Sequence, residues 1–147
     1  MRLPKPARLA QKDLEALGPV KESWTEHGRT HQVYGVAVDE LLGAAGFTPG
    51  PMGKDVPKRD KRAGWKMGLR VTGSNGFQIL FSCAELWEGM GSTRALLVWE
   101  VDGKPLPSDL GPFRIVVLTD REPSRSVHNV TELEVLDLRS STDSRRK

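Results

Sequence analysis

The sequence predicts an α+β domain with a mixed, largely antiparallel sheet and short helices. About seven segments have the apolar or alternating pattern of strands, and about three short segments have helical spacing or capping signals. The helical segments fall between pairs of strands rather than in one block. A chain of 147 residues with 37% hydrophobic content suits one folded domain with polar flanks. We therefore expect a single domain over residues 1–138.

The most informative stretch is ALLVWEVDGKPLPSDLGPFRIVV, residues 95–117. Its loop lies between two segments that are apolar except for Glu100 and Arg114, residues 96–101 and 113–118, and such segments are typical of buried strands. Asp102 and Gly103 favour a turn, because glycine adopts positive φ without cost. The prolines that follow prevent the loop from continuing either strand. The prediction is two buried strands joined by a turn and a proline-rich loop.

The N-terminal part of the chain predicts a helix, a hairpin and a second helix. Residues 11–17 have helical spacing and end at a Gly-Pro pair. Residues 20–27 and 29–34 read as strands that turn at Gly28. Residues 36–45 place apolar side chains at helical spacing and stop at a glycine.

The remaining segments predict a second hairpin and a final strand. Residues 67–72 and 77–81 read as strands on either side of Asn75-Gly76, a dipeptide that favours a hairpin turn because both residues tolerate positive φ. A serine then caps a short predicted helix over residues 83–87. Residues 130–138 alternate as a strand.

Two segments differ in composition from the rest. Residues 52–66 are rich in lysine and arginine and poor in apolar residues, so we expect a basic surface loop inserted into the domain. This loop could bind nucleic acid through phosphate contacts, but Trp65 is its only aromatic residue and the net charge of the chain is only +3. We therefore favour a solvated insertion. Residues 139–147 are charged and serine-rich, and we expect a disordered tail.

Composition also limits the function classes. Cys83 is the only cysteine, so no intrachain disulfide forms and no cysteine cluster holds a metal. No apolar run approaches the roughly 20 residues needed to span a bilayer, so we expect no membrane segment. Residues 1–10 lack the apolar core of a signal peptide. The compartment stays open between a cytoplasmic protein and an exported one whose signal has been removed.

Six segments together carry a resemblance to a known family. They are DLEAL (13–17), YGVAVDELLGAAG (34–46), RVTGSNGFQILFSCAEL (70–86), VDGKPLP (101–107), GPFRIVV (111–117) and SVHNVTELEVLDL (126–138). In this order and spacing they resemble the molybdopterin-binding domain of the sulfite-oxidase family, over residues 9–138. The resemblance implies that family's α+β fold.

The resemblance also implies cofactor-binding residues and reveals a missing one. Arg114 matches the family's Pro-x-Arg segment, and Ser126, Val127 and His128 match a Ser-Val-Lys segment that contacts the pterin phosphate, with His in place of Lys. The family's molybdenum is held by a cysteine shortly before the aromatic-Gly-Val segment. Residues 20–33 contain no cysteine, and neither serine nor histidine replaces a soft thiolate. We therefore assign no catalytic residue and no metal ligand, and expect no bound cofactor, with molybdopterin as the alternative that the resemblance implies.

Several residues have both a functional and a structural interpretation. Four cationic residues could form a phosphate-binding cluster; these are Arg114, Arg121, Arg125 and His128. The competing interpretation pairs Arg114 with a carboxylate at a strand end and leaves the others as solvated loop charges. His27 and His31 flank a predicted turn and could bind a metal, but the sequence offers no third ligand, so we favour a structural role. Cys83 could be a nucleophile, but we favour a small apolar residue near a helix start.

The leading functional hypothesis is a small, stand-alone molybdopterin-binding-domain-like protein without a working molybdenum centre. It would bind a small anionic ligand or a protein partner in the remaining pocket. The first alternative is a molybdopterin-dependent oxidoreductase of the sulfite-oxidase type, and the second is nucleic-acid binding through residues 52–66. The sequence does not specify the substrate or the oligomeric state.

Overall fold

The computed structural model describes residues 11–44, 67–86, 91 and 93–137. The elements along the chain are α1 (Gln11–Glu15), β1 (Val20–Glu26), β2 (Arg29–Ala37), α2 (Val38–Ala44), β3 (Met67–Gly73), β4 (Gln78–Ser82), β5 (Ala95–Val101), β6 (Lys104–Pro105), β7 (Arg114–Val117), the 3-10 turn η3 (Pro123–Arg125) and β8 (Val130–Asp137). The predicted basic loop over residues 52–66 and the predicted tail over residues 139–147 lie outside the described residues.

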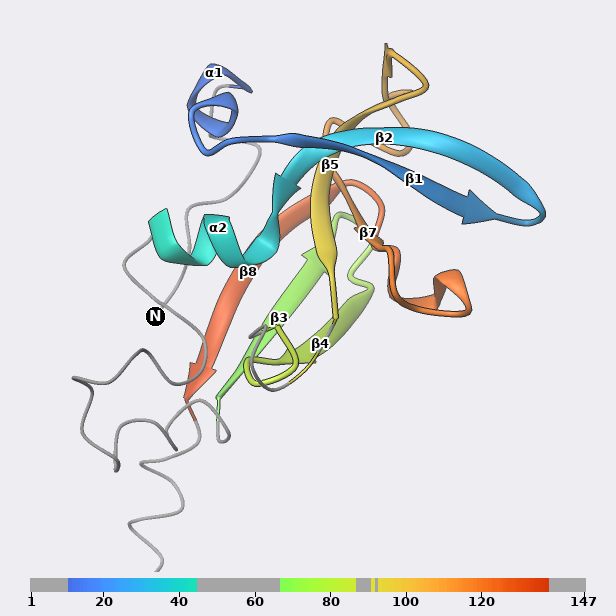
Figure 1. Cartoon of the computed structure of the whole chain (residues 1–147). Helices are drawn as coiled ribbons and strands as arrows, with labels where there is room; N and C mark the ends of the chain where they lie inside the picture. The colour runs from blue at the N-terminus through green and yellow to red at the C-terminus, as the bar shows by residue number, and fades with distance from the viewer. Residues whose placement is uncertain (1–10, 45–66, 87–90, 92, 138–147) are drawn as a thin grey trace, which may run out of the picture.

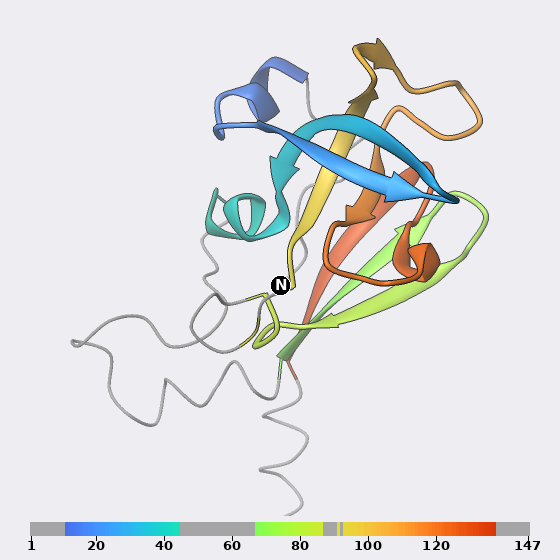
Figure 2. The ribbon, with the colours of Figure 1, turned by 45° about the vertical axis from the view of Figure 1, so that its right-hand side comes forward.

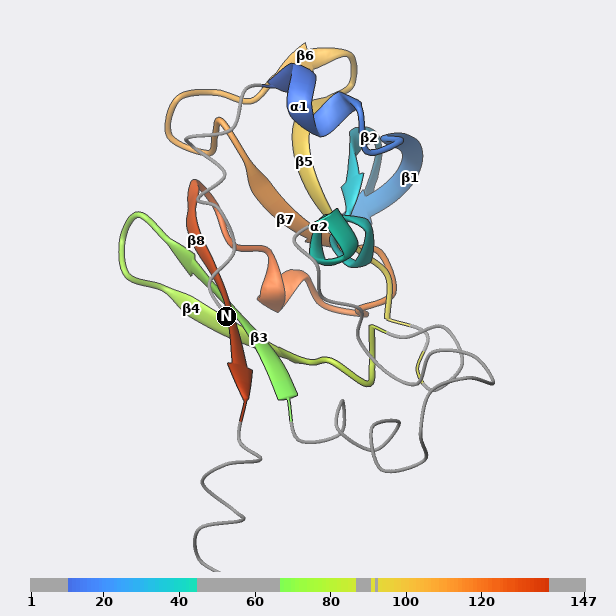
Figure 3. The same ribbon diagram turned by 90° about the vertical axis from the view of Figure 1, so that its left-hand side faces the viewer.

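The strands form two antiparallel sheets (Figures 1 and 3). One sheet has the order β1-β2-β5-β6, with β7 also paired to β5, and the other has the order β4-β3-β8. All strand pairs in the described part of the chain are antiparallel. The predicted α+β class with largely antiparallel strands and few short helices is confirmed. The sequence pattern predicted one sheet, whereas the structure divides the strands between two.

Backbone hydrogen bonds connect the two sheets beside β7. The Ile115 N–H donates to the carbonyl of Val127 at 2.9 Å, and the Val130 N–H donates to the carbonyl of Phe113 at 2.9 Å. As a result, the segment that leads into β8 runs along β7. Figure 2 shows β7 and β8 close together. This arrangement brings residues 126–128 next to the strand that carries Arg114.

The strands β5 and β7 are buried on both faces, as the continuous apolar pattern predicted. One face packs into a large core between the sheets, which includes Leu97 and Ile115. The opposite face belongs to a smaller core cluster; its members are Trp24, Val33, Leu96, Val98 and Val116. Burial of each large aliphatic side chain contributes about 1.5–3 kcal/mol, so both clusters hold the first sheet together.

Three tight turns connect neighbouring strands. In the β1–β2 turn His27 and Gly28 have φ values of 50° and 78°, and in the β5–β6 turn Asp102 and Gly103 have 54° and 79°. The predicted turn at Asp102-Gly103 is therefore confirmed. At the β3–β4 turn only Gly76 has positive φ, and the Asn75 side chain accepts the Phe77 N–H at 3.0 Å.

The helical predictions need correction at three places. The second helix begins at Val38 instead of residue 36, because Val36 and Ala37 belong to β2 and pair with β5. The first helix ends at Glu15 instead of residue 17. Residues 83–86 form turns instead of a helix, although Ser82 and Glu85 exchange the two hydrogen bonds of a capping box, at 2.8 and 3.1 Å. The segment is too short to offset the cost of helix nucleation, and the Glu85 carbonyl accepts the Thr93 N–H instead. Within the described part of the chain, no helix is long and apolar enough to cross a membrane.

Candidate anion-binding pocket

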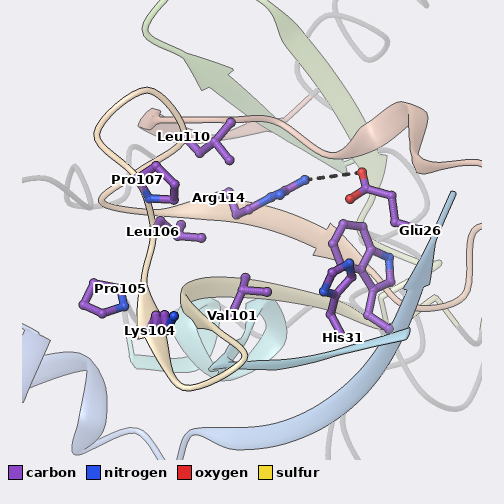
Figure 4. A pocket seen from close by; sticks show the side chains of 10 residues that line it. Glu26, His31, Val101, Lys104, Pro105, Leu106, Pro107, Leu110 and Arg114 are labelled. Carbon is purple, nitrogen blue, oxygen red and sulfur yellow. Dashed lines mark ion pairs between the residues drawn. The ribbon is translucent and has the colours of Figure 1, made fainter. Parts of the chain in front are cut away.

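A pocket of about 350 Å³ lies between the β1–β2 hairpin and the loop that joins β6 to β7 (Figure 4). One wall is charged and aromatic; it consists of Trp24, Glu26, His31 and Arg114. The opposite wall is mostly aliphatic, is rich in proline and includes one cation, Lys104; it consists of Val101, Lys104, Pro105, Leu106, Pro107 and Leu110. The pocket therefore combines fixed charges with an apolar surface, which is typical of small-molecule sites.

Strand alternation places the charged wall on one face of the first sheet. Trp24 and Glu26 are two residues apart in β1, so their side chains leave the strand on the same face. His31 is the β2 partner of Trp24, and Arg114 is the β7 partner of Val98. Trp24 and Val98 both belong to the smaller core cluster, so this cluster forms the floor beneath the charged groups.

Arg114 is the one charged side chain that is buried in the described part of the chain, with 5% of its surface exposed. Its guanidinium carbon lies 5.0 Å from the centre of the Trp24 ring. Among the described residues neither Nε nor Nη2 has a hydrogen-bond partner. Leaving one buried donor unpaired costs about 1–3 kcal/mol, so these two N–H groups are a strong signal for a bound acceptor.

Glu26 is the nearest carboxylate to Arg114. Its Oε1 lies 4.0 Å from Nη2, which is an ion pair but too long for a hydrogen bond (Figure 4). Burial lowers the pKa of Arg114, and the charge of Glu26 partly opposes that shift. Glu26 is the last residue of β1, so the interpretation that paired Arg114 with a carboxylate at a strand end describes this contact. That contact leaves the guanidinium donors available to a ligand.

His31 is held at the rim of the pocket by Asp102. The Nδ1–H donates to Asp102 Oδ2 at 2.7 Å, and the other carboxylate oxygen accepts the Gln32 N–H at 2.9 Å. The hydrogen bond from His31, followed by that from Gln32, lowers the pKa of Asp102. Because the ionised carboxylate accepts from Nδ1, the second ring nitrogen Nε2 is left without the proton when the imidazole is neutral.

The segment that the resemblance assigned to the pterin phosphate lies beside the pocket. Val127 is 1% exposed, packs in the large core and contributes its carbonyl to β7. The Ser126 N–H donates to the Pro123 carbonyl at 3.3 Å. His128 is exposed, and its pKa is lowered first by partial burial and then by the positive charge of Arg114. Of the four assigned residues, Arg114 lines the pocket and the other three do not.

Arg125 belongs to a separate ion-pair network. Its Nε and Nη2 donate to the two carboxylate oxygens of Asp120 at 2.9 Å each, and Nη1 donates to Glu85 at 2.9 Å. The guanidinium also stacks over Phe81 at 4.6 Å. These contacts occupy its donors, so Arg125 ties η3 to the end of β4 and does not join Arg114 in a phosphate-binding cluster.

The donors at the pocket do not fit the molybdenum centre that the resemblance implies. Cys83 is fully buried, does not line the pocket, and has a pKa raised to about 11 by burial. It is the only cysteine of the chain, so the pocket has no thiolate. In the described ranges no group of three or more His, Cys, Asp or Glu side chains could hold a metal ion. We therefore derive no chemical step through that cofactor.

Sequence analysis identified Arg114 but not the residues that surround it. Of the tryptophans in the chain, Trp24 lines the pocket and Trp99 is core, whereas Trp87 lies outside the described residues. Glu26 shares the alternation of Trp24, a signal that could have placed both on one face. The fold and the site define a small α+β domain with a charged, partly apolar pocket. No family model matches the chain, and no curated protein matches it in sequence.

Proposed function

We propose that this chain is a small binding protein on a molybdopterin-domain-like scaffold, and that its pocket takes a small anionic ligand through Arg114. The observation that carries the proposal is the buried guanidinium with two unused donors. Burying a charged group without hydrogen bonds is costly, and an oxyanion that accepts from both N–H groups removes that cost.

The chemistry of the walls defines the class of ligand. A guanidinium matches carboxylate and phosphate oxygens because it offers two parallel N–H donors. Lys104 lines the same pocket and adds a second positive charge. The leucine and proline side chains opposite favour a ligand with a small apolar body attached to the anionic group.

Titration calorimetry with benzoate, phenylphosphate and inorganic phosphate tests the proposal. We expect saturable binding of at least one of these probes, and a loss of about 10- to 100-fold in Arg114→Lys, because lysine keeps the charge but lacks the bidentate geometry. Arg121→Lys is the matched control, since Arg121 is an exposed loop residue outside the pocket lining. Absence of binding for all three probes, or equal affinity in the two variants, contradicts the proposal.

A working molybdenum centre is not part of this proposal. The single thiol is buried and absent from the pocket lining, so no soft ligand is available there. We expect elemental analysis of the protein, purified from a molybdenum-replete host, to find less than stoichiometric metal. Stoichiometric molybdenum together with a bound pterin would support the oxidoreductase alternative instead.

A further inference from the structure

We infer that the ligand of the Arg114 pocket is a zwitterion, an α-amino acid with an apolar side chain, whose carboxylate binds Arg114 and whose ammonium group binds Glu26. This inference rests on the proposed function and makes its ligand class more specific. It follows from the charge that lies opposite Arg114 in the same pocket.

The Glu26 carboxylate is an unused acceptor beside an unused donor. Its side chain is 23% exposed, and its neighbours are Arg114 Nη2 at 4.0 Å and His27 Nε2 at 3.9 Å. Both distances exceed hydrogen-bond length, and no hydrogen bond to this carboxylate is found among the described residues. The gap between Arg114 and Glu26 therefore leaves both groups available for contact with a ligand.

A ligand with only negative charge satisfies Arg114 but matches this arrangement less well than a ligand that also carries a positive group. Its anionic group would bind Arg114 close to the Glu26 carboxylate, and like charges at such separations repel strongly in a partly buried site. An α-amino acid carries an ammonium group one carbon away from its carboxylate. Placed antiparallel to the Arg114–Glu26 pair, it sets each ligand charge against the opposite protein charge.

The remaining lining accommodates the side chain of such a ligand. Leu106, Pro107 and Leu110 lie on the side of the pocket away from Glu26 and His31, as Figure 4 shows. They offer apolar surface without hydrogen-bond donors beyond the backbone. The lining also contains Lys104, so its cations outnumber its single carboxylate, and the ligand's own carboxylate remains essential for binding.

Four probes with the same apolar body separate the contributions of the two charges. They are leucine, 4-methylpentanoate, which lacks the ammonium group, N-acetylleucine, in which it is blocked, and leucinamide, which lacks the carboxylate. By calorimetry or NMR titration we expect leucine to bind at least about 10-fold more tightly than any of the other three.

Exchange of the carboxylate tests the assignment to Glu26. In Glu26→Gln we expect leucine affinity to fall by about 10-fold and 4-methylpentanoate to bind as tightly as leucine or more tightly, because the repulsive charge is gone. Glu15→Gln is the control, since it removes an exposed carboxylate of α1 outside the pocket and should leave the order of the four probes unchanged.

The outcomes distinguish the inference from the function on which it rests. If 4-methylpentanoate or N-acetylleucine matches leucine in the wild-type protein, the zwitterion inference is overturned and anion binding stands. If leucine does not bind, the zwitterion inference fails, and the proposed function fails with it only if benzoate, phenylphosphate and inorganic phosphate do not bind either. The wild-type comparison decides the matter without any variant, so a variant that does not fold leaves the test intact.

Discussion

At the scale of single residues, the charge of Arg114 acts on the titratable groups around it. His128 is exposed, yet its pKa is lowered, first by partial burial and then by the Arg114 guanidinium. Glu26 and Asp109 oppose the shift. The pKa of His128 therefore depends on the charge of Arg114. The chain has only three histidines, so the signal of His128 is simple to assign.

An NMR titration of the three histidines should place the pKa of His128 below its ordinary value of about 6.5. We expect Arg114→Met to raise it, and an anion bound at Arg114 to raise it in the wild-type protein. Because the unfolded chain binds the proton more readily, His128 lowers the stability of the fold as pH falls through 6.5. A His128 pKa that is the same in Arg114→Met would show that the guanidinium charge does not reach it.

Cys83 provides a second prediction at this scale. Its thiol is buried and its pKa is raised to about 11, so roughly one molecule in ten thousand carries the thiolate at pH 7. We expect a thiol reagent such as Ellman's reagent to react with the native protein at least about 100-fold more slowly than with the urea-unfolded chain. Equal rates in the two states would contradict the buried position.

At the scale of elements, the β2–β5 pair that supports the pocket requires a close backbone approach. A Cβ atom at Gly35 would lie 2.1 Å from the Leu97 carbonyl oxygen and 2.7 Å from the Val98 Cα. The register of this strand pair shifts between Tyr34 and Gly35, which is typical of a β-bulge. Glycine is therefore needed here for space, and not for a positive φ.

We expect Gly35→Ala to lower the free energy of unfolding by at least about 2 kcal/mol, since backbone atoms must move to admit the methyl group. Gly43→Ala is the matched control, because Gly43 lies in α2 and a Cβ there meets no atom within 4 Å. That variant should be neutral or more stable by up to about 1 kcal/mol, as alanine favours helix. Urea unfolding followed by circular dichroism measures both, and equal effects would contradict the packing at Gly35.

At the scale of the whole molecule, ionised carboxylates help to hold separate elements together. Glu85 accepts hydrogen bonds from Ser82, Arg125 and Thr93, and Asp102 links β2 to the β5–β6 turn through His31 and Gln32. Burial acts to raise the pKa of Glu85, but these hydrogen bonds outweigh it and lower the pKa. The pKa of Asp102 is lowered by His31 and Gln32.

A group whose pKa is lower in the folded state stabilises the fold above its unfolded pKa and loses that contribution as pH falls through the folded value. For Glu85 and Asp102 the unfolded values are the ordinary ones of about 4.3 and 3.9. We therefore expect these two carboxylates to contribute a constant stabilisation above about pH 5 and a declining one in more acidic solution. Glu85→Gln should cost about 1 kcal/mol at pH 7 and reduce the acid slope, as measured by urea unfolding at several pH values. An unchanged slope would contradict the role of Glu85.

Local sequence pattern by itself determined much of the architecture. The alternating and apolar segments predicted β1 to β5, β7 and β8, because side-chain period and continuous hydrophobicity are properties of a few neighbouring residues. Asp102-Gly103 predicted its turn for the same reason. Arg114 was singled out as an anion-binding residue by the family resemblance and not by local pattern. The turns at residues 83–86 were mistaken for a helix, because a cap signal alone does not decide whether the capped turn develops into a helix.

What only the tertiary structure decided is which residues meet. The division into two sheets and the pairing of Trp24 with His31 depend on contacts between distant segments, and their register is set by packing rather than by local sequence. That packing placed Glu26 opposite Arg114, left Nε and Nη2 of Arg114 without hydrogen-bond partners among the described residues, and paired Arg125 with Asp120 and Glu85. The sequence by itself predicted that one cation, Arg114, lies in a buried strand. The fold made it the candidate for an anion-binding site, because only the fold sets where a charge is desolvated and which groups remain to pair with it.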